Sequence, residues 1–583
     1  MQPQCRSPTA GTRRPHLLHI VVDDLGHRDL GFNNPERHSP NIDHLRACGV
    51  VLDHFYAPKA CAPSRASIMT GRYPFHVGVY SNVDVDTYGV PTNFTFLPEL
   101  LRRHAGYATH AVGKWHLGHR SVGMTPTYRG FDSFFGFWHC CSDYHTHTFP
   151  GGGLDLTRAN GTQLATERGH AGEYSAAMYA DVASAIIRSH PRGVPLYLYL
   201  AFQSVHGPYQ VPSRYRHAQA SAHPAWSAKR QTYAAMVAAM DAAVGQVVRT
   251  LRGAKLWEAS LVLLMSDNGG ALGMMQNEPL RGGKFTLWEG GVRVPFLLSG
   301  PVMFARRGGR WDGLSHTSDI LPTLLAAAGA AAAAAALAPP LDGVSLWAAL
   351  LSNASSPRRE VIHQVVSRWS PRDCLGADHD AQNCGAALRV GRYKLLAGYP
   401  GDARDSAEAA DSAAWEPDYA AFPSNASLMA RSDGCRLADG ARCRCWRAAC
   451  LFDVVADPSE AVELSGARPR LAALLARRLA EASLSASQGA AACAAARAAD
   501  AAAARRMYAE GGAHLPFAAE AAWRDEREAP SCYNGWHAAQ RSGFGIGPPK
   551  EALAAMLNGS SGGAAARRGG GVKTRGGAAE VPR

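Results

Sequence analysis

The sequence predicts an α/β fold: a large mixed, mostly parallel sheet flanked by helices, with a smaller C-terminal α+β domain. Two features of the chain support this prediction, namely near-continuous apolar runs and the polar residues that directly follow each run. Runs of this kind are typical of strands buried on both faces of a sheet that helices cover. The length of 583 residues exceeds what one simple core needs, so a second domain is expected.

Four apolar runs are expected to form the central strands, and each ends in side chains that can do chemistry. The runs and the groups that follow them are residues 17–22 with Asp23 and Asp24, residues 109–113 with Lys114 and His116, residues 196–202 with His206, and residues 261–265 with Asp267 and Asn268. Ligands of such sheets bind beyond the carboxyl ends of the strands. The sheet itself would therefore bring these groups together.

Other elements follow from spacing and composition. Residues 233–252 carry apolar side chains at helical spacing and are expected to form a core helix packed against the sheet. The Ala-rich run at residues 325–338 can extend a helix. In the smaller domain, strands are expected at residues 388–396 and 451–454, and a helix is expected at residues 472–484.

The expected organisation along the chain has several parts. A flexible N-terminus covers residues 1–15, and the catalytic α/β domain covers residues 16–360. The smaller domain covers residues 361–550 and includes an irregular surface loop at residues 400–449. Residues 551–583 form a Gly/Ala/Arg-rich tail that we expect to be disordered.

The chain carries a net charge of +12, and a basic surface of this kind can favour polyanions such as sulfated sugars. Residues 550–583 hold six Lys or Arg and two Asp or Glu, so part of this charge belongs to the tail. The sequence shows neither zinc-finger spacing nor a basic helix interleaved with aromatic residues, so no nucleic acid partner is expected. The Ala-rich tract is too short to span a bilayer, so no transmembrane segment is expected.

Cysteines and glycosylation motifs indicate an oxidising compartment. The chain has 13 cysteines, and the cluster Cys435, Cys443, Cys445 and Cys450 contains no His, which favours disulfides over a zinc site. Asn-X-Ser/Thr sequons stand at Asn93, Asn160, Asn353, Asn425 and Asn558. We expect a glycoprotein of the secretory pathway, lysosomal or extracellular, although no signal peptide is visible in the polar first residues.

The segment Cys61-Ala62-Pro63-Ser64-Arg65 is the most informative one in the chain. Pro63 suits the first position of a helix, so Cys61 is expected just before a helix N-terminus, which attracts anions. Arg65 follows one helical turn after Cys61, so both side chains can face the same spot. Taken alone, the segment could equally hold a buried structural cysteine before an ordinary helix.

Oxygen ligands and lysines extend this candidate site. Asp23-Asp24 and Asp267-Asn268 offer the carboxylate and amide oxygens that Ca²⁺ or Mg²⁺ prefers. Each pair alone would be read as a turn or a cap, but two pairs at neighbouring strand ends favour a metal site. Lys114 and His116 are two residues apart, so on an extended strand both would face one side. The Gly-rich segment 279–291 carries Lys284.

Together these motifs resemble the type I sulfatases of the alkaline phosphatase-like superfamily, over about residues 16–350. Within that family the likeness is closest to the arylsulfatase B group, the N-acetylgalactosamine-4-sulfatases. The resemblance implies that the formylglycine-generating enzyme oxidises Cys61 to formylglycine during maturation. It also implies one divalent cation, usually Ca²⁺ with Mg²⁺ as the alternative, with the ligands Asp23, Asp24, Asp267, Asn268 and the modified Cys61.

The resemblance further implies a role for each remaining residue. Arg65 would orient the hydrated aldehyde, and Lys114 and Lys284 would hold the sulfate. His206 would protonate the leaving alcohol, and His116 would act as the base that releases sulfate. The implied function is that of a sulfuric ester hydrolase that cleaves sulfate esters of sulfated sugars.

Two other functions are compatible with the same residues. A phosphodiesterase or phosphonate hydrolase of the same superfamily can share the nucleophile and the metal site. A non-catalytic protein that binds sulfated glycans would keep Cys61 as an unmodified cysteine.

Overall fold

The computed structural model describes residues 14–35, 37, 39–82, 89–149, 153–337, 340–365, 385–398, 400–401, 445, 449–483 and 486. All of these lie in one compact unit, Met1–Ser542. The predicted tail, most of the predicted loop at 400–449, and the cysteines Cys435 and Cys443 lie outside the described residues.

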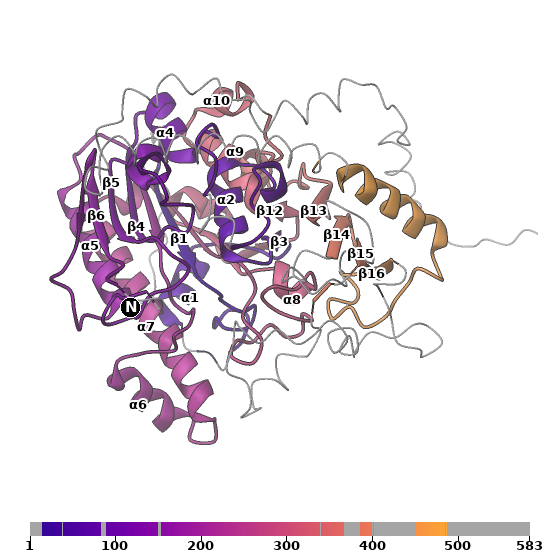
Figure 1. Cartoon of the computed structure of the whole chain (residues 1–583), viewed down its shortest axis with the longest axis horizontal. Helices are drawn as coiled ribbons and strands as arrows, with labels where there is room; N and C mark the ends of the chain where they lie inside the picture. The colour runs from indigo at the N-terminus through magenta and orange to yellow at the C-terminus, as the bar shows by residue number, and fades with distance from the viewer. Residues whose placement is uncertain are drawn as a thin grey trace, which may run out of the picture. The chain divides into compact units, whose positions relative to one another are not determined.

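A mixed sheet of ten strands forms the centre of the fold (Figure 1). Its strands are β1 (His16–Val22), β2 (Gly49–Leu52), β4 (Ala108–Lys114), β5 (Ser133–Phe137), β6 (Thr157–Asn160), β7 (Gln163–Thr166), β8 (Leu196–Ala201), β9 (Ser260–Ser266), β10 (Phe296–Ser299) and β11 (Gly309–Trp311). Their order is β11-β2-β10-β9-β1-β8-β4-β5-β6-β7. The adjacent strands β9, β1, β8, β4 and β5 run parallel to one another. In contrast, β10 pairs antiparallel with β9, β6 with β5, and β7 with β6. The predicted mixed, mostly parallel sheet is confirmed.

The four predicted strands are the four central neighbours β9, β1, β8 and β4. Their carboxyl ends are aligned, because Val22 pairs with Ser266 and Val21 pairs with Ala201. Every residue of β8 and of β9 is buried, as continuous apolar runs predict. The polar residues that follow these strands therefore meet at one edge of the sheet.

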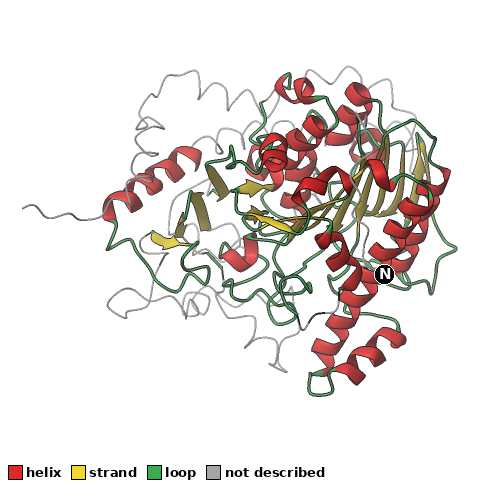
Figure 2. Ribbon diagram, turned by 180° about the vertical axis from the view of Figure 1, so that it is seen from behind, coloured by secondary structure: helices red, strands yellow, loops and turns green. Residues whose placement is uncertain are grey.

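Helices cover both faces of this sheet (Figure 2). Successive residues of β1 belong to two different hydrophobic clusters, one on each face of the sheet. Leu17 packs with α2 (Cys61–Thr70), α4 (Leu97–Ala105) and α9 (Ile320–Ala327). Leu18 packs with α1 (Pro40–Ala47), α5 (Ser175–Ser189) and α7 (Ala228–Gly253). This alternation follows from the two-residue period of a strand. Further helices are α6 (Ser213–Ala222), α8 (Glu289–Val292), α10 (Ala331–Ala335) and α11 (Trp347–Ser352). The 3-10 turns are η1 (Pro74–His76), η2 (Val122–Met124), η3 (Pro126–Arg129), η4 (Trp257–Ala259), η5 (Pro301–Arg306) and η6 (Thr317–Asp319).

The predicted core helix is α7, and it is the one helix among the described residues long and apolar enough to cross a membrane. Of its apolar window, 72% is buried inside the fold, which is the environment of a core helix. The Ala-rich run behaves differently from a simple helix extension. Gly329 takes a positive φ of 72° and separates α9 from α10, because a left-handed glycine ends a helix.

A smaller antiparallel sheet contains β13 (Glu360–Gln364), β14 (Gly385–Val390), β15 (Tyr393–Gly398) and β16 (Cys450–Asp453), in that order. The predicted strand region 388–396 is a hairpin, since residues 391–392 turn the chain between β14 and β15. A disulfide joins Cys445 to Cys450, and residues 469–483 form the expected helix. The boundary at 360/361 stays a prediction. A separate two-stranded sheet pairs β3 (Phe55–Tyr56) with β12 (Ser315–His316).

Candidate active site

The pairs Asp23-Asp24 and Asp267-Asn268 meet at the carboxyl edge of the sheet. Asp23 and Asp24 follow β1, and Asp267 and Asn268 follow β9. The backbone N–H of Asp24 donates to Asp267 Oδ1 at 3.2 Å, and Asn268 Nδ2 donates to Asp24 Oδ1 at 2.7 Å. All of these residues are at most 2% exposed, so water screens their charges little.

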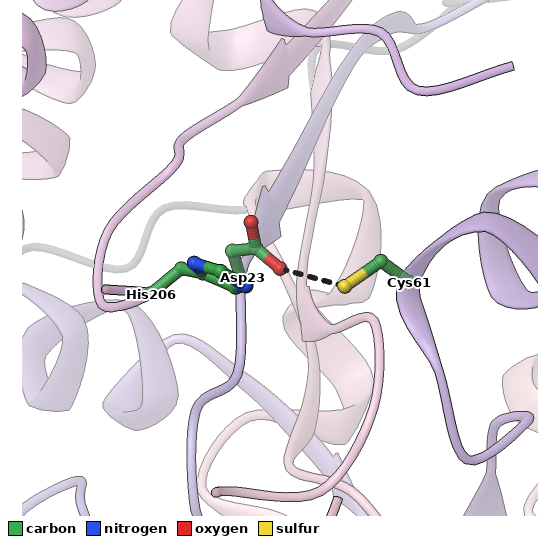
Figure 3. A group of neighbouring side chains, drawn as sticks. All are labelled: Asp23, Cys61 and His206. Atoms are coloured by element: carbon green, nitrogen blue, oxygen red, sulfur yellow. Dashed lines mark hydrogen bonds between the residues drawn. The ribbon is translucent and has the colours of Figure 1, made fainter. Parts of the chain in front are cut away.

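Cys61 lies against the first of these pairs. Its thiol donates to Asp23 Oδ1 at 3.4 Å, and Sγ lies 4.0 Å from Asp24 Oδ1. Figure 3 shows the thiol pointing at the Asp23 carboxylate, with His206 beyond it. Burial, and then the charge of Asp23, raise the pKa of the Cys61 thiol well above its usual value. The unmodified side chain is therefore a protonated thiol and a poor nucleophile.

The helix that carries Cys61 begins two residues earlier than the sequence predicts, at Cys61 rather than at Pro63. Cys61 is the first residue of α2, Ala60 is its N-cap, and Pro63 is the third residue. A proline fits here as well, because the first N–H groups of a helix have no partner within the helix. Cys61 therefore sits in the first turn, where the helix dipole favours anions.

Arg65 follows one turn after Cys61 and is fully buried. Its Nε and Nη2 donate to Asp267 Oδ2 at 3.0 Å and 2.7 Å. Nη1 also donates to the backbone oxygen of Lys114 at 3.3 Å, and Nη2 lies 3.8 Å from Asp23 Oδ1. The guanidinium thus links α2 to the ends of three strands.

Two buried lysines contact the same carboxylates. Lys114 Nζ lies 2.6 Å from Asp23 Oδ2, and Lys284 Nζ lies 2.7 Å and 2.8 Å from the two oxygens of Asp24. Burial opposes ionisation of both carboxyls, but Lys114 and Lys284 respectively hold their pKa values below the usual range. The backbone of the loop that carries Lys284 packs closely against Gly270. A Cβ on Gly283 would come within 2.4 Å of the Gly270 backbone oxygen, so this position requires glycine.

The two histidines are held at the site by different backbone conformations. His206 follows β8, and its Nε2 lies 3.7 Å from Asp24 Oδ2. His116 does not share a strand face with Lys114 as predicted, because β4 ends at Lys114 and His116 takes a positive φ of 51°. Burial and the nearby Lys114 lower the pKa of His116 well below its usual value, and burial and Lys284 lower that of His206.

The donor set fits a hard divalent cation. Ligand atoms of Asp23, Asp24, Cys61 and Asp267 all lie within 4.8 Å of one another. Asn268 Oδ1 is buried and accepts no hydrogen bond, while its Nδ2 donates to two oxygens. Such an unpaired buried acceptor is costly unless an ion binds it. Burial, and then the charge of Asp23, also raise the pKa of Asp267, so a cation bound beside it would favour its ionised form.

Residues that sequence patterns did not reveal hold the histidine segment. Tyr144 OH donates to the backbone oxygens of His206 and Gln203, at 2.8 Å and 3.0 Å. Ser204 O accepts from the backbone N–H of Asp23 at 2.9 Å. Only the tertiary fold brings Tyr144 to this segment, so no local pattern could have identified it.

Comparisons with known proteins agree on one family. A family model described as Sulfatase matches residues 15–330. Arylsulfatase J of Mus musculus is 33% identical over 484 residues, which cover 81% of this chain and 76% of that protein. N-acetylgalactosamine-6-sulfatase of Homo sapiens is 31% identical over 378 residues, which cover 58% of this chain and 66% of that protein. The solved structure of Ps i-CgsB in complex with k-i-k-neocarrahexaose aligns with a TM-score of 0.62 and 26% identity, covering 81% of this chain and 93% of that one.

Proposed function

The chain belongs to the sulfatase family and is a sulfuric ester hydrolase, and we propose that it acts on sulfated sugars through a formylglycine formed at Cys61. One observation carries this proposal: Cys61 Sγ, the buried carboxylates and two ammonium groups lie together at the carboxyl edge of the sheet. A protonated thiol held against Asp23 has little reactivity of its own. Oxidation by the formylglycine-generating enzyme gives this position a competent nucleophile: the hydrated aldehyde supplies one hydroxyl that displaces the alcohol from sulfur and a second through which sulfate is released.

We assign the cation site to the oxygens of Asp23, Asp24, Asp267 and Asn268 together with the modified residue 61. All-oxygen donors favour a hard cation, with Ca²⁺ expected and Mg²⁺ as the alternative. When bound, the ion stabilises negative charge on the reacting oxygens and on the sulfate.

The charges of the site explain how it binds an anionic substrate. Its carboxylates belong to Asp23, Asp24 and Asp267, and its cations belong to Arg65, Lys114 and Lys284. These charges balance one another, so a divalent cation makes the whole set positive. Lys114 and Lys284 are then the groups that turn their ammonium hydrogens to the sulfate oxygens. Arg65 keeps Asp267 in place.

The two histidines transfer the protons of the reaction. His206 donates a proton to the leaving alcohol, and His116, neutral because of its lowered pKa, accepts the proton of the hydroxyl that releases sulfate. Burial lowers the pKa of His206 too, so it carries its proton only in acid. This favours an acidic working pH.

The expected compartment is the secretory pathway, ending in a lysosome or outside the cell. The sequons at Asn93, Asn160 and Asn353 are exposed, and the Cys445–Cys450 disulfide suits an oxidising lumen. A sugar substrate is supported by the N-acetylgalactosamine-6-sulfatase relatives and by a structural neighbour bound to an oligosaccharide. Within the family, the arylsulfatase B group stays a prediction.

The test compares two substrates on the purified full chain. Release of nitrophenol from p-nitrophenyl sulfate and from bis(p-nitrophenyl) phosphate is measured side by side, with Cys61→Ala as the background. We expect the sulfate ester to be hydrolysed faster and the variant to be inactive on both. Preference for the phosphate diester would favour a phosphodiesterase, and no turnover by a chain that still binds sulfated glycan would favour a binding protein.

A further inference from the structure

A strongly basic segment follows the catalytic His206. Residues 207–240 contain no Asp or Glu, and Arg214, Arg216, Lys229 and Arg230 give the segment four positive charges. We call residues 213–231, which comprise α6 and the start of α7, the basic arm. Arg214 and Arg216 are exposed, whereas Lys229 and Arg230 are half-buried.

Topology puts the basic arm at the same edge of the sheet as the active site. β8 and β9 both run parallel to β1, so α7, which connects them, must return from the carboxyl edge to the amino edge. The first turns of α7 therefore lie at the carboxyl edge. Both Figure 1 and Figure 2 show α6 and this end of α7 projecting from the body of the protein.

Direct contacts tie the base of the arm to the metal-binding segment. Tyr233 OH donates to Asp29 Oδ2 at 2.7 Å, and Asp29 follows Asp24 by five residues. Arg37 lies 3.4 Å from Asp29 Oδ1, and its guanidinium carbon lies 5.2 Å from the ring centre of Trp226 in the arm. The arm is therefore fixed relative to the site. Ser213 follows His206 by seven positions, so at most about 25 Å lies between them.

We propose that the basic arm binds the polyanionic chain of a sulfated polysaccharide whose scissile ester occupies the active site. The inference rests on the proposed function and extends it, because it makes the substrate a polymer rather than a single sulfated sugar. A segment that carries four positive charges and no acidic residue attracts a polyanion. Screening limits this attraction to about 8 Å at physiological salt, so the arm acts on the part of the chain that contacts it and leaves the reacting ester unaffected.

The same surface fits other polyanions less well. His223 stacks on Trp226 at 3.7 Å between ring centres, and Arg230 lies 4.2 Å from the centre of the Trp226 ring, so this ring already packs against two side chains and is less accessible to a nucleic acid base. Among the described residues, the exposed large hydrophobic side chains are Leu351, Val455 and Val462, none of which lies in the arm. The arm thus lacks the apolar face that a membrane-bound helix needs.

The test uses the full chain with the double variant Arg214→Gln/Arg216→Gln. The matched control is Arg188→Gln/Arg192→Gln, which removes two exposed arginines just before β8, at the opposite edge of the sheet. The probes are chondroitin sulfate, as substrate and as an immobilised ligand, and p-nitrophenyl sulfate. We expect the arm variant to raise the KM for chondroitin sulfate, or its half-saturating concentration for binding, by about threefold to tenfold. The kcat, and both constants for p-nitrophenyl sulfate, should stay unchanged.

Each alternative result is informative. Equal changes in the arm and control variants, or no change in either, would overturn the proposal. So would an arm variant that loses binding to DNA or to phosphatidylserine vesicles but not to chondroitin sulfate. If the wild type fails to hydrolyse p-nitrophenyl sulfate, the proposed function is wrong, and binding to immobilised chondroitin sulfate still decides the role of the arm.

Discussion

Arg65 donates from two guanidinium nitrogens to a single carboxylate oxygen of Asp267, at 3.0 Å and 2.7 Å, and both side chains are fully buried. This pair joins the first turns of α2, which carries Cys61, to the end of β9. Two segments 202 positions apart in the sequence are thereby held in one geometry. This ion pair, together with the contacts of Arg65 to Asp23 and to the backbone oxygen of Lys114, therefore helps to set the orientation of the nucleophile and of the cation site.

Arg65→Lys tests this dependence while it keeps the charge. A lysine ammonium cannot reproduce the paired donation of a guanidinium, so Asp267 and α2 should lose their alignment. We expect kcat to fall on the order of 10²-fold, as for small misplacements of reacting groups. The measurement is the rate on p-nitrophenyl sulfate per mole of formylglycine, because a substitution this close to Cys61 can also change the fraction of Cys61 that is converted. Unchanged kcat per converted chain would contradict this role.

His206 is tested through the leaving group. An alkyl or sugar alcohol needs a proton to leave, whereas nitrophenolate leaves without one. His206→Ala should therefore slow hydrolysis of a sugar sulfate by about 10²-fold or more and slow p-nitrophenyl sulfate far less. Equal losses on both substrates would show that His206 does not act as the acid.

The cation site is tested at Asn268, whose Oδ1 has no hydrogen-bond partner. Asn268→Leu removes this oxygen and should weaken Ca²⁺ binding by about tenfold or more, whereas Asn268→Asp retains a ligand. Binding of Ca²⁺ to the folded state raises Tm, so Ca²⁺ titrations after chelation report affinity without an activity assay. If Tm of the leucine variant responds to Ca²⁺ as the wild type does, Asn268 is not a ligand.

A buried carboxyl in the smaller sheet region predicts a pH dependence of stability. Lys394 Nζ lies 2.9 Å from Glu460 Oε1 and 3.0 Å from Glu289 Oε1, and all of these side chains are fully buried. Burial raises the pKa of Glu460 to about 7. Burial alone would also raise the pKa of Glu289, but Lys394 lowers it to about 2. Below neutral pH the Lys394 ammonium group therefore contacts an ionised Glu289 and a protonated Glu460.

The sign of the effect follows from proton linkage. Between pH 4.5 and 7 the folded state keeps the Glu460 proton that the unfolded state releases, so the free energy of unfolding falls as pH rises through this window. Glu460→Gln should flatten that slope. The check is Tm at pH 5, 6 and 7.5 for both proteins, and an unchanged slope in the variant would rule out Glu460 as its source.

The sequence was sufficient for the centre of the fold. Continuous apolar runs predicted β1, β4, β8 and β9, because strands buried on both faces must be apolar throughout. The polar pairs that follow β1 and β9 came together because parallel strands end at one edge. The pattern of apolar residues and the composition are local properties of the sequence, and they were enough to predict these strands.

Contacts between distant segments could not be predicted in the same way. The bond between Arg65 and Asp267, and the pairing of Lys394 with Glu289, depend on how whole elements pack. His116 was expected on a strand, but a positive φ turns its backbone away, which no apolar pattern encodes. The antiparallel strand β10 is likewise paired by the tertiary fold, and its four residues carry little periodicity.

Formylglycine at position 61 is the nucleophile that we propose. Trypsin cleaves after Lys59 and Arg65, so residues 60–65 form one peptide whose mass distinguishes the aldehyde from cysteine. The decisive measurement is the converted fraction of this peptide in preparations of differing specific activity, with Cys61→Ser as the unconverted control. We expect activity in proportion to the converted fraction and none in the variant. Full activity in a preparation that contains only unmodified Cys61 would contradict the assignment of formylglycine as the nucleophile.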